Sequence, residues 1–297
     1  MKKISVLAPA KINLYLDVLC RRADGYHDIE SVMQTVSLFD RLTVTRNEAE
    51  DEQTISLSCK NPAIPTDEKN LICRAALRFF EETKIERYHV SFFLEKKIPS
   101  EAGLGGGSSD AAATLLALNR LYDTELSEEE LYAIGAKIGA DVSFCIKKGT
   151  AYVTGIGERM VSAPLMPDCA FLIAKPKGKG ISTAEAYRAI DALPAETETG
   201  SFRAFGEALI NHDLFGMTKL LYNKFEYVTP PSVGSAALKE RFLQTGAYGA
   251  LMSGSGSAVF AVYPDEAAAC RARDLLSEDT EVFLCTPVRR HFNYFED

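Results

Sequence analysis

The 297-residue sequence lacks the features of a membrane or secreted protein. No run approaches the roughly 20 apolar residues that a membrane helix needs. The opening segment MKKISVLAPAKINL is interrupted by Pro9, Lys11 and Asn13 and does not resemble a signal peptide. The seven cysteines are odd in number and form no CxxC pair, which predicts reduced thiols rather than a disulfide framework or a zinc site. We therefore expect a cytoplasmic protein without membrane contacts.

An excess of positive charge is also missing. The chain has 33 Lys and Arg residues against 41 Asp and Glu residues, a formal net charge of −8, so we expect no broad electrostatic binding of nucleic acid. His89, His212 and His291 show no metal-ligand spacing, and we predict no metal held by protein side chains. What is present is an ordinary globular composition, 46% hydrophobic and 25% charged, in a chain long enough for two domains.

Alternating and helical patterns are interspersed along the chain, which indicates an α+β fold. Strand patterns occur at residues 12–18, 42–46, 55–59, 90–94, 151–153, 171–174, 259–262 and 282–285. Helical spacing occurs at 70–82, 111–122, 183–190, 202–211, 235–243 and 265–276. A capping box at Ser127 predicts a further helix that ends near Gly139. Two prolines between 163 and 168 predict a domain boundary, and the order of elements beyond it indicates a ferredoxin-like second half.

The stretch GLGGGSSDAA, residues 103–112, places four glycines in front of a helical pattern. Glycine costs backbone entropy in an ordered element, so this cluster indicates positive φ values or a close approach to the backbone. The loop connects a predicted strand, ended by Pro99, to a predicted helix with Ser108 or Ser109 as N-cap. Free N–H groups and the helix dipole suit such a place to phosphate. A tight turn with a close backbone contact is the alternative explanation.

The loop fits none of the common nucleotide-binding signatures. GxxxxGK[ST] is absent, GxGxxG fails at its last position, and the protein-kinase motif set is missing. The pattern PxxxGLGGGSSD resembles instead the second motif of the GHMP kinases. PAKINL at residues 9–14 resembles their first motif and LMSGSGSAVFAV at 251–262 their third, so the resemblance spans nearly the whole chain. Residues 8–40 resemble most closely a branch whose acceptor is a methylerythritol carrying a diphosphocytidyl group.

The resemblance implies a two-domain GHMP kinase fold. A ribosomal-protein-S5-like α/β domain would occupy residues 1–163 and a ferredoxin-like α+β domain residues 164–297. It also implies a kinase that uses ATP and Mg²⁺ to phosphorylate the 2-hydroxyl of its acceptor, in the non-mevalonate route to isoprenoid precursors. We expect a small-molecule substrate and a monomer or weak homodimer. The ATP-binding loop would comprise Pro99, Ser100, Glu101, Ala102, Gly103, Leu104, Gly105, Gly106, Gly107, Ser108 and Ser109.

Asp141 and Lys11 are the candidates for catalysis. Asp141 follows a predicted helix and precedes the apolar VSFCI, where a carboxylate could equally cap the next short helix. Lys11 lies on the polar face of a predicted strand, where most lysines are solvated charges. The resemblance makes the aspartate of the G-A-D-V motif, residues 139–142, the base toward the acceptor hydroxyl. It places Lys11 nearby to stabilise the developing alkoxide. Ser143 stands where the family has proline.

We expect the base of the acceptor near Tyr26 and His27, in the segment DGYHD. An aromatic face beside a hydrogen-bonding edge suits a pyrimidine, and the resemblance implies cytosine recognition here, although a lone histidine is more often structural. Tyr187 occupies the place of the family's second aromatic in a base sandwich. The other expected substrate-site residues come from the first and third motifs: Asn13, Gly254 and Ser255.

Two observations leave alternatives open. Residues 223–226 are NKFE where the family commonly has NDLE, a change that could alter packing beside the substrate pocket. Glu101 is unfavourable beside phosphate unless it points to solvent. The alternative functions are a GHMP-type kinase of another small alcohol, such as homoserine, a sugar or a mevalonate-like compound, and a non-catalytic nucleotide sensor. The expected base contacts argue against the first, and the presence of Asp141 and Lys11 argues against the second.

Overall fold

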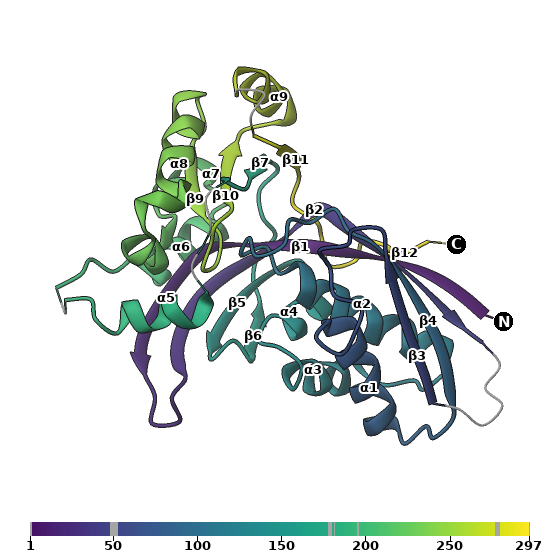
Figure 1. Cartoon of the computed structure of the whole chain (residues 1–297). Coiled ribbons are helices and arrows are strands. Elements are labelled where there is room, and N and C mark those ends of the chain that lie inside the picture. Colours follow the sequence, from purple (N-terminus) through teal and green to yellow (C-terminus); the bar gives the residue numbers. More distant parts are fainter. Residues whose placement is uncertain are drawn as a thin grey trace.

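The computed structural model describes residues 2–47, 53–177, 180, 182–194, 196–276 and 280–296. Its longest elements are two antiparallel strands, β1 (Lys2–Arg21) and β2 (His27–Arg46). They pair along almost their whole length, with register shifts at three places. Figure 1 shows this pair running across the molecule, with one group of helices below it and a second sheet above it. The two long strands therefore connect both halves of the structure.

β1 and β2 belong to an eight-stranded sheet, which includes strands from both halves of the chain. Its other members are β3 (Gln53–Cys59), β4 (Tyr88–Glu95), β5 (Thr150–Gly155), β6 (Arg159–Ser162), β8 (Tyr222–Asn223) and β12 (Phe295–Glu296). The main order is β12-β1-β2-β4-β3, while β5 pairs with β2 and β6, and β8 pairs with β1. The pairs β3–β4 and β1–β8 are parallel. Two short strands from the second half of the chain, β8 and β12, thus pair with β1 in the first sheet.

Helices α1 (Leu71–Thr83), α2 (Gly106–Leu121), α3 (Glu128–Ala136) and α4 (Val142–Lys147) cover one face of this sheet. α2 packs centrally, against β1, α1 and α4. Its alanines at 111–113 are buried, and such small side chains let the helix lie close to the strands. Phe79, Phe92 and Phe144 fill the same core. The glycine loop is therefore attached to a helix that packs against a long strand and two other helices.

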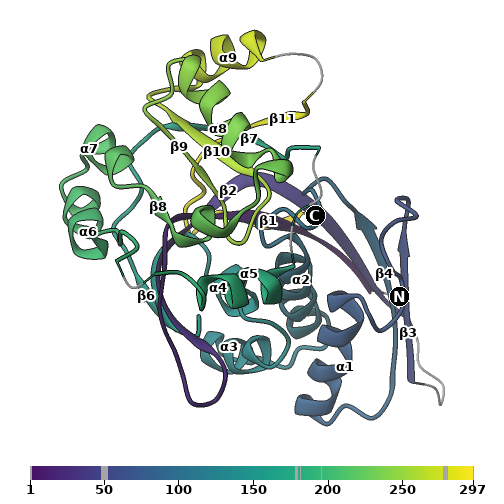
Figure 2. The same ribbon diagram turned by 60° about the vertical axis from the view of Figure 1, so that its left-hand side comes forward.

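A second, antiparallel sheet consists of β7 (Ala170–Ala174), β9 (Gly249–Met252), β10 (Val259–Tyr263) and β11 (Val282–Cys285), in the order β11-β7-β10-β9. α8 (Ser235–Gln244) and α9 (Glu266–Leu275) pack on one face, and residues of β1 pack on the other. Figure 2 shows these two helices on the outer side of the molecule. The strand–helix–strand–strand–helix–strand sequence with this order confirms the predicted ferredoxin-like half. α5 (Thr183–Ile190), α6 (Phe202–Ile210) and α7 (Leu214–Lys219) lie between β7 and β9.

Several predicted boundaries differ from the structure. The prediction that Ser108 or Ser109 caps α2 is wrong, because the helix already begins at Gly106, with Gly105 as N-cap in the left-handed region. α3 ends at Ala136 rather than near Gly139, and β4 ends before Pro99 is reached. β2 is far longer than the predicted 42–46, because its central part is buried on both faces and does not alternate. Within the described part of the chain, no helix combines the length and apolar character needed to cross a bilayer.

Candidate active site

Residues of the first, second and third motifs meet at the start of α2. The backbone N–H of Lys11 donates to the carbonyl of Leu104 (2.9 Å), which joins β1 to the glycine loop. The Ser253 hydroxyl donates to the carbonyl of Gly103 (3.0 Å) and accepts from the backbone N–H of Asn13 (3.3 Å). One buried serine therefore links all three motifs.

Gly103 and Gly105 are required by their backbone conformation and by close packing. Their φ values are +73° and +67°, in the region that glycine adopts without a steric penalty. A Cβ at Gly103 would lie 1.9 Å from the carbonyl oxygen of Ser253, and one at Gly105 would lie 2.8 Å from Cγ of Lys11. The tight-contact explanation therefore accounts for these two glycines, whatever the loop binds.

The first turn of α2 offers backbone amides to an anion. The first hydrogen bond of the helix runs from the Ser109 N–H to the Gly105 carbonyl (2.8 Å), so the N–H groups of residues 106–108 have no partner within the helix. A cavity of about 360 Å³, called here the nucleotide cavity, opens beside them. Its wall includes every predicted ATP-binding residue except Ser109, which is buried. Glu101 lies on this wall with its side chain exposed.

Lys11 and Asp141 form an ion pair in a neighbouring cavity. Lys11 Nζ lies 3.3 Å from Asp141 Oδ2 and donates to Asn13 Oδ1 at 2.7 Å. The Lys11 side chain is 5% exposed and that of Asp141 is 30% exposed, so the carboxylate remains open to a ligand. Asp141 occupies the N-cap position of α4 but makes no capping hydrogen bond. The explanation of Asp141 as a helix cap is therefore wrong, as is that of Lys11 as a solvated charge.

The cavity that contains Lys11 and Asp141, called here the reaction cavity, has a volume of about 720 Å³. It adjoins the nucleotide cavity, because residues of the glycine loop line both. Gly254 and Ser255 also line it. A Cβ at Gly254 would lie 3.4 Å from Lys11 Nζ, and the Ser255 hydroxyl lies 2.9 Å from that of Thr183 at the start of α5. The structure thus brings the third motif together with the first, as the resemblance implied.

A third cavity, of about 690 Å³, contains the expected base contacts Tyr26, His27 and Tyr187 and is called here the base cavity. The imidazole of His27 stacks on the ring of Tyr187 with centroids 4.7 Å apart, and His27 Nε2 lies 2.7 Å from Asp191 Oδ1. Tyr187 lines the reaction cavity as well, so the two spaces adjoin. Burial first, and the charge of Asp141 second, raise the pKa of Tyr187 to about 12, so its hydroxyl stays protonated at neutral pH.

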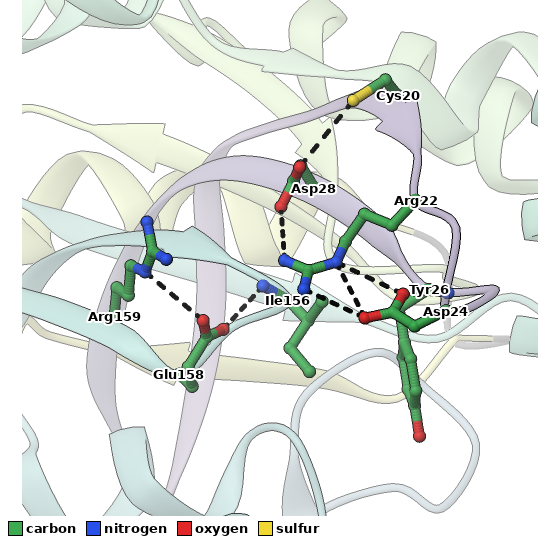
Figure 3. Close-up of polar contacts among 8 residues, drawn as sticks. All are labelled: Cys20, Arg22, Asp24, Tyr26, Asp28, Ile156, Glu158 and Arg159. Atoms are coloured by element: carbon green, nitrogen blue, oxygen red, sulfur yellow. Dashed lines mark hydrogen bonds and ion pairs between the residues drawn. The ribbon is translucent and has the colours of Figure 1, made fainter.

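Ion pairs restrain the loop between β1 and β2 that carries Tyr26 (Figure 3). The Arg22 guanidinium pairs with Asp24 (3.0 Å) and with Asp28 (3.1 Å). The backbone N–H of Tyr26 donates to Asp24 Oδ1 at 3.1 Å, while Tyr26 as a whole residue is 61% exposed. Exposed pairs contribute little to global stability, but they limit the conformations of the loop. Residues 156–158, in the turn between β5 and β6, line the base cavity together with Tyr26.

The NKFE segment at 223–226 packs against the wall of the reaction cavity. Lys224 Nζ lies 3.2 Å from Oδ1 of the buried Asp17 on β1, so its charge is paired away from the reaction cavity. Phe225 lines that cavity and meets the ring of Tyr187 edge-on, at 5.1 Å and 83°. The departure from the family pattern therefore places an aromatic ring behind Tyr187 and balances a buried carboxylate.

Three residues that hold the site together were not predicted from the sequence. Ser253 connects the motifs, Asn223 Nδ2 donates to the Gly254 carbonyl at 2.8 Å, and Asp191 pairs with His27. Ser253 and Asn223 are polar residues within apolar or motif segments, and asking which buried backbone groups they satisfy could have singled them out. Asp191 gives no comparable signal, because its contact joins the end of α5 to the start of β2.

Comparisons with known proteins agree with this arrangement. The models of the GHMP kinases N terminal domain and the GHMP kinases C terminal match residues 70–149 and 189–279. A 4-diphosphocytidyl-2-C-methyl-D-erythritol kinase of a Geobacillus species is 42% identical over 261 residues, 87% of each chain. One from Listeria monocytogenes is 42% identical over 289 residues, 96% of each chain. A crystal structure of 4-(cytidine 5'-diphospho)-2C-methyl-D-erythritol kinase matches with a TM-score of 0.77 and 34% identity, covering 95% of this chain and 98% of that one. The chain belongs to the GHMP kinase family, and its curated relatives cover most of its length.

Proposed function

We propose that this protein transfers the γ-phosphoryl group of ATP to the 2-hydroxyl of 4-diphosphocytidyl-2-C-methyl-D-erythritol, giving the 2-phosphate and ADP. The observation that most supports this is the position of the Lys11–Asp141 pair. It lies in a cavity that adjoins the glycine loop on one side and the base cavity on the other. The relatives in Geobacillus and Listeria, which carry the name of that kinase, support the choice of acceptor.

Asp141 and Lys11 would act on the acceptor hydroxyl. The hydroxyl oxygen forms a bond to the γ-phosphorus, the bond from that phosphorus to the β,γ-bridging oxygen breaks, and the hydroxyl proton passes to Asp141 Oδ2. The Lys11 ammonium, fixed by Asn13, stabilises the negative charge that develops on the acceptor oxygen. Since an aspartate is a weak base, alignment of the hydroxyl and charge stabilisation would supply more of the rate than proton abstraction.

The glycine loop would hold the triphosphate through the N–H groups of residues 106–108 and the dipole of α2. Mg²⁺, bound together with ATP, would neutralise part of the phosphate charge. The described residues include no group of three or more His, Cys, Asp or Glu side chains placed to hold a metal. Mg²⁺ would enter with ATP, whose oxygens are the ligands it prefers.

His27, Tyr26 and Tyr187 would recognise the cytosine base. When His27 is neutral and its Nε2–H donates to Asp191, its Nδ1 is left as an acceptor. An acceptor at this edge suits the amino group of cytosine and not the carbonyl of uracil. Stacking on the tyrosine rings would supply affinity without distinguishing the bases. Binding energy from the base would then hold the distant hydroxyl in line.

We also propose that the chain divides near residue 163, into an ATP-binding unit at 1–163 and a second unit at 164–297. In support, β7, the first strand of the second sheet, begins at Ala170. β8 and β12 lie beyond this boundary and pair with β1, so the two units share the first sheet.

A panel of acceptors tests the proposed function. The purified protein is mixed with MgATP and either 4-diphosphocytidyl-2-C-methyl-D-erythritol, homoserine or mevalonate, and ADP release is measured. Asp141→Asn is the control for contaminating kinases. Acceptor-dependent release with the cytidyl compound alone is expected. Faster release with homoserine or mevalonate would assign the protein to another GHMP kinase activity, and release with none of them would favour a nucleotide sensor.

A further inference from the structure

A buried cluster of three charged side chains lies beneath the glycine loop. Lys96, which follows β4, donates to Asp40 Oδ2 on β2 (2.5 Å) and to Asp110 Oδ2 on α2 (2.7 Å). The side chains of Lys96, Asp40 and Asp110 are 8%, 0% and 4% exposed. Burying charge is costly unless the charges are paired, and the mechanism above uses none of the three.

The cluster borders the nucleotide cavity as well as the core. Lys96 and Asp110 are both part of the cavity wall. A Cβ at Gly106 would lie 2.9 Å from Lys96 Nζ, so the ammonium group lies against the first residue of α2. The cluster is therefore next to the backbone N–H groups at which the phosphates of ATP are proposed to bind.

The two carboxylates have different surroundings. Asp40 Oδ1 accepts the backbone N–H groups of Lys97 (2.6 Å) and Ile98 (2.8 Å) in addition to the bond from Lys96 to its other oxygen. Such bonds favour the ionised form. Asp110 Oδ2 accepts the bond from Lys96, and Asp110 Oδ1 is buried without a hydrogen-bond partner among the described residues. Burial, opposed by the charge of Lys96, raises the pKa of Asp110 well above its usual value.

The charge of the cluster matters because its neighbour would be a polyphosphate. With both carboxylates ionised, the cluster carries one net negative charge, which would repel ATP and oppose the dipole of α2. With a proton on Asp110, the charges of Lys96 and Asp40 cancel. We propose that Asp110 is part of the nucleotide site and carries a proton whenever ATP or ADP is bound, so that nucleotide binding takes up this proton where the free protein has lost it. The proposal rests on the proposed position of ATP at the glycine loop.

Four other titratable side chains on the elements that pack against α2 are paired, hydrogen-bonded or protonated. The Lys11 ammonium on β1 is paired with Asp141. The Arg74 guanidinium on α1 donates to a backbone carbonyl at 3.3 Å. Burial raises the pKa of both thiols on the neighbouring helices, Cys73 and Cys145. The charges that act on Asp110 itself are those of Lys96 and Asp40.

Titration calorimetry with MgADP tests the proposal on the wild-type protein. At each pH from 6 to 9.5, binding is measured in two buffers with different enthalpies of ionisation, which gives the number of protons taken up. The phosphate of ADP, with a second pKa of about 6, is ionised over most of this range. We expect a window with uptake of close to one proton per ADP. In that window the affinity for MgADP falls by up to about tenfold for each unit by which the pH rises, because the complex binds more protons than the free protein.

Two variants assign the proton. Asp110→Asn keeps the shape and remains neutral, and its Oδ1 can still accept from Lys96. It should lose the proton uptake and bind MgADP more tightly than the wild type at pH 9. Glu68→Gln is the control, because it neutralises an exposed carboxylate just before α1 that is not part of the cavity wall. It should keep the proton uptake of the wild type.

The outcomes separate this proposal from the proposed function. Binding of MgADP without proton uptake at any pH in this range, or uptake that persists in Asp110→Asn, would overturn the role of Asp110 and leave the nucleotide site in place. Failure of the wild type to bind MgADP at any pH would overturn both. The proton count of the wild type does not depend on whether a variant folds.

Discussion

Replacing Gly106 by valine would put a side chain where the structure has no room for one. A Cβ there would lie 2.9 Å from Lys96 Nζ and 3.0 Å from Ile98 Cγ2. Lys96 cannot retreat without leaving the two carboxylates to which it donates. Forcing additional methyl groups into a packed core costs about 1–3 kcal/mol. Since relief of the contact must shift either the lysine or the first turn of α2, we also expect MgADP to bind about tenfold more weakly, or worse, which corresponds to about 1.4 kcal/mol.

The neighbouring glycine provides a matched control. A Cβ at Gly107 would meet only Leu71 Cδ1, at 3.5 Å, an ordinary contact. Alanine is favoured over glycine within a helix by about 0.5–1 kcal/mol, so Gly107→Ala should be at least as stable as the wild type. Urea denaturation followed by circular dichroism measures stability, and calorimetry measures affinity. A Gly106→Val protein with the urea midpoint and MgADP affinity of the wild type would refute both the close packing at Gly106 and the assignment of this turn to phosphate.

Two further predictions concern charged groups. Asp141→Asn should keep its affinity for ADP and lose about 10²–10⁴-fold in kcat, as loss of an acid–base group does; turnover near the wild-type rate in an ADP-release assay would contradict this. The ammonium of Lys148 is buried 3.4 Å from the centroid of the Tyr294 ring, and burial lowers its pKa from 10.5 to about 7. Above pH 10.5 Lys148 is neutral in both the folded and the unfolded protein, and its burial then has no ionisation cost. As the pH falls from 10.5 toward 7, the unfolded state takes up the proton first, so the free energy of unfolding falls by about 1.4 kcal/mol per pH unit. Lys148→Met should melt at a higher temperature than the wild type, with the largest difference in Tm at or below pH 7 and a smaller one at pH 9, and a pH-independent difference would argue against a buried lysine.

Sequence patterns predicted most of the helices and strands, because side-chain periodicity and helix caps depend on residues that are close together in the chain. The capping box at Ser127 forms as expected, and Asn70 caps the predicted first helix. The start of α2 was misplaced because Gly105 itself ends the loop in a left-handed conformation, and no side-chain cap is needed. The length of β2 was underestimated because a strand buried on both faces carries no alternation for a sequence reading to detect.

The site was predictable where a motif is continuous and not where partners come from distant segments. Lys11 and Asp141 could be named from their motifs, but their 3.3 Å separation depends on how α4 packs beside β1. The contact between His27 and Asp191 and the pairing of Lys224 with Asp17 join segments far apart in the chain. No spacing rule connects such residues, since only the packed fold brings them together.

Recognition of the base separates the proposed acceptor from the alternative acceptors homoserine and mevalonate, which have no base. The most direct test compares kcat/KM for the cytidyl acceptor and its uridyl analogue, in the wild type and in His27→Ala. We predict a strong preference of the wild type for the cytidyl compound. We expect His27→Ala to reduce this preference by about tenfold or more, as loss of a base-specific hydrogen bond worth about 1–3 kcal/mol does. A ratio near one in the wild type, or a ratio unchanged in His27→Ala, would contradict recognition of cytosine at this site.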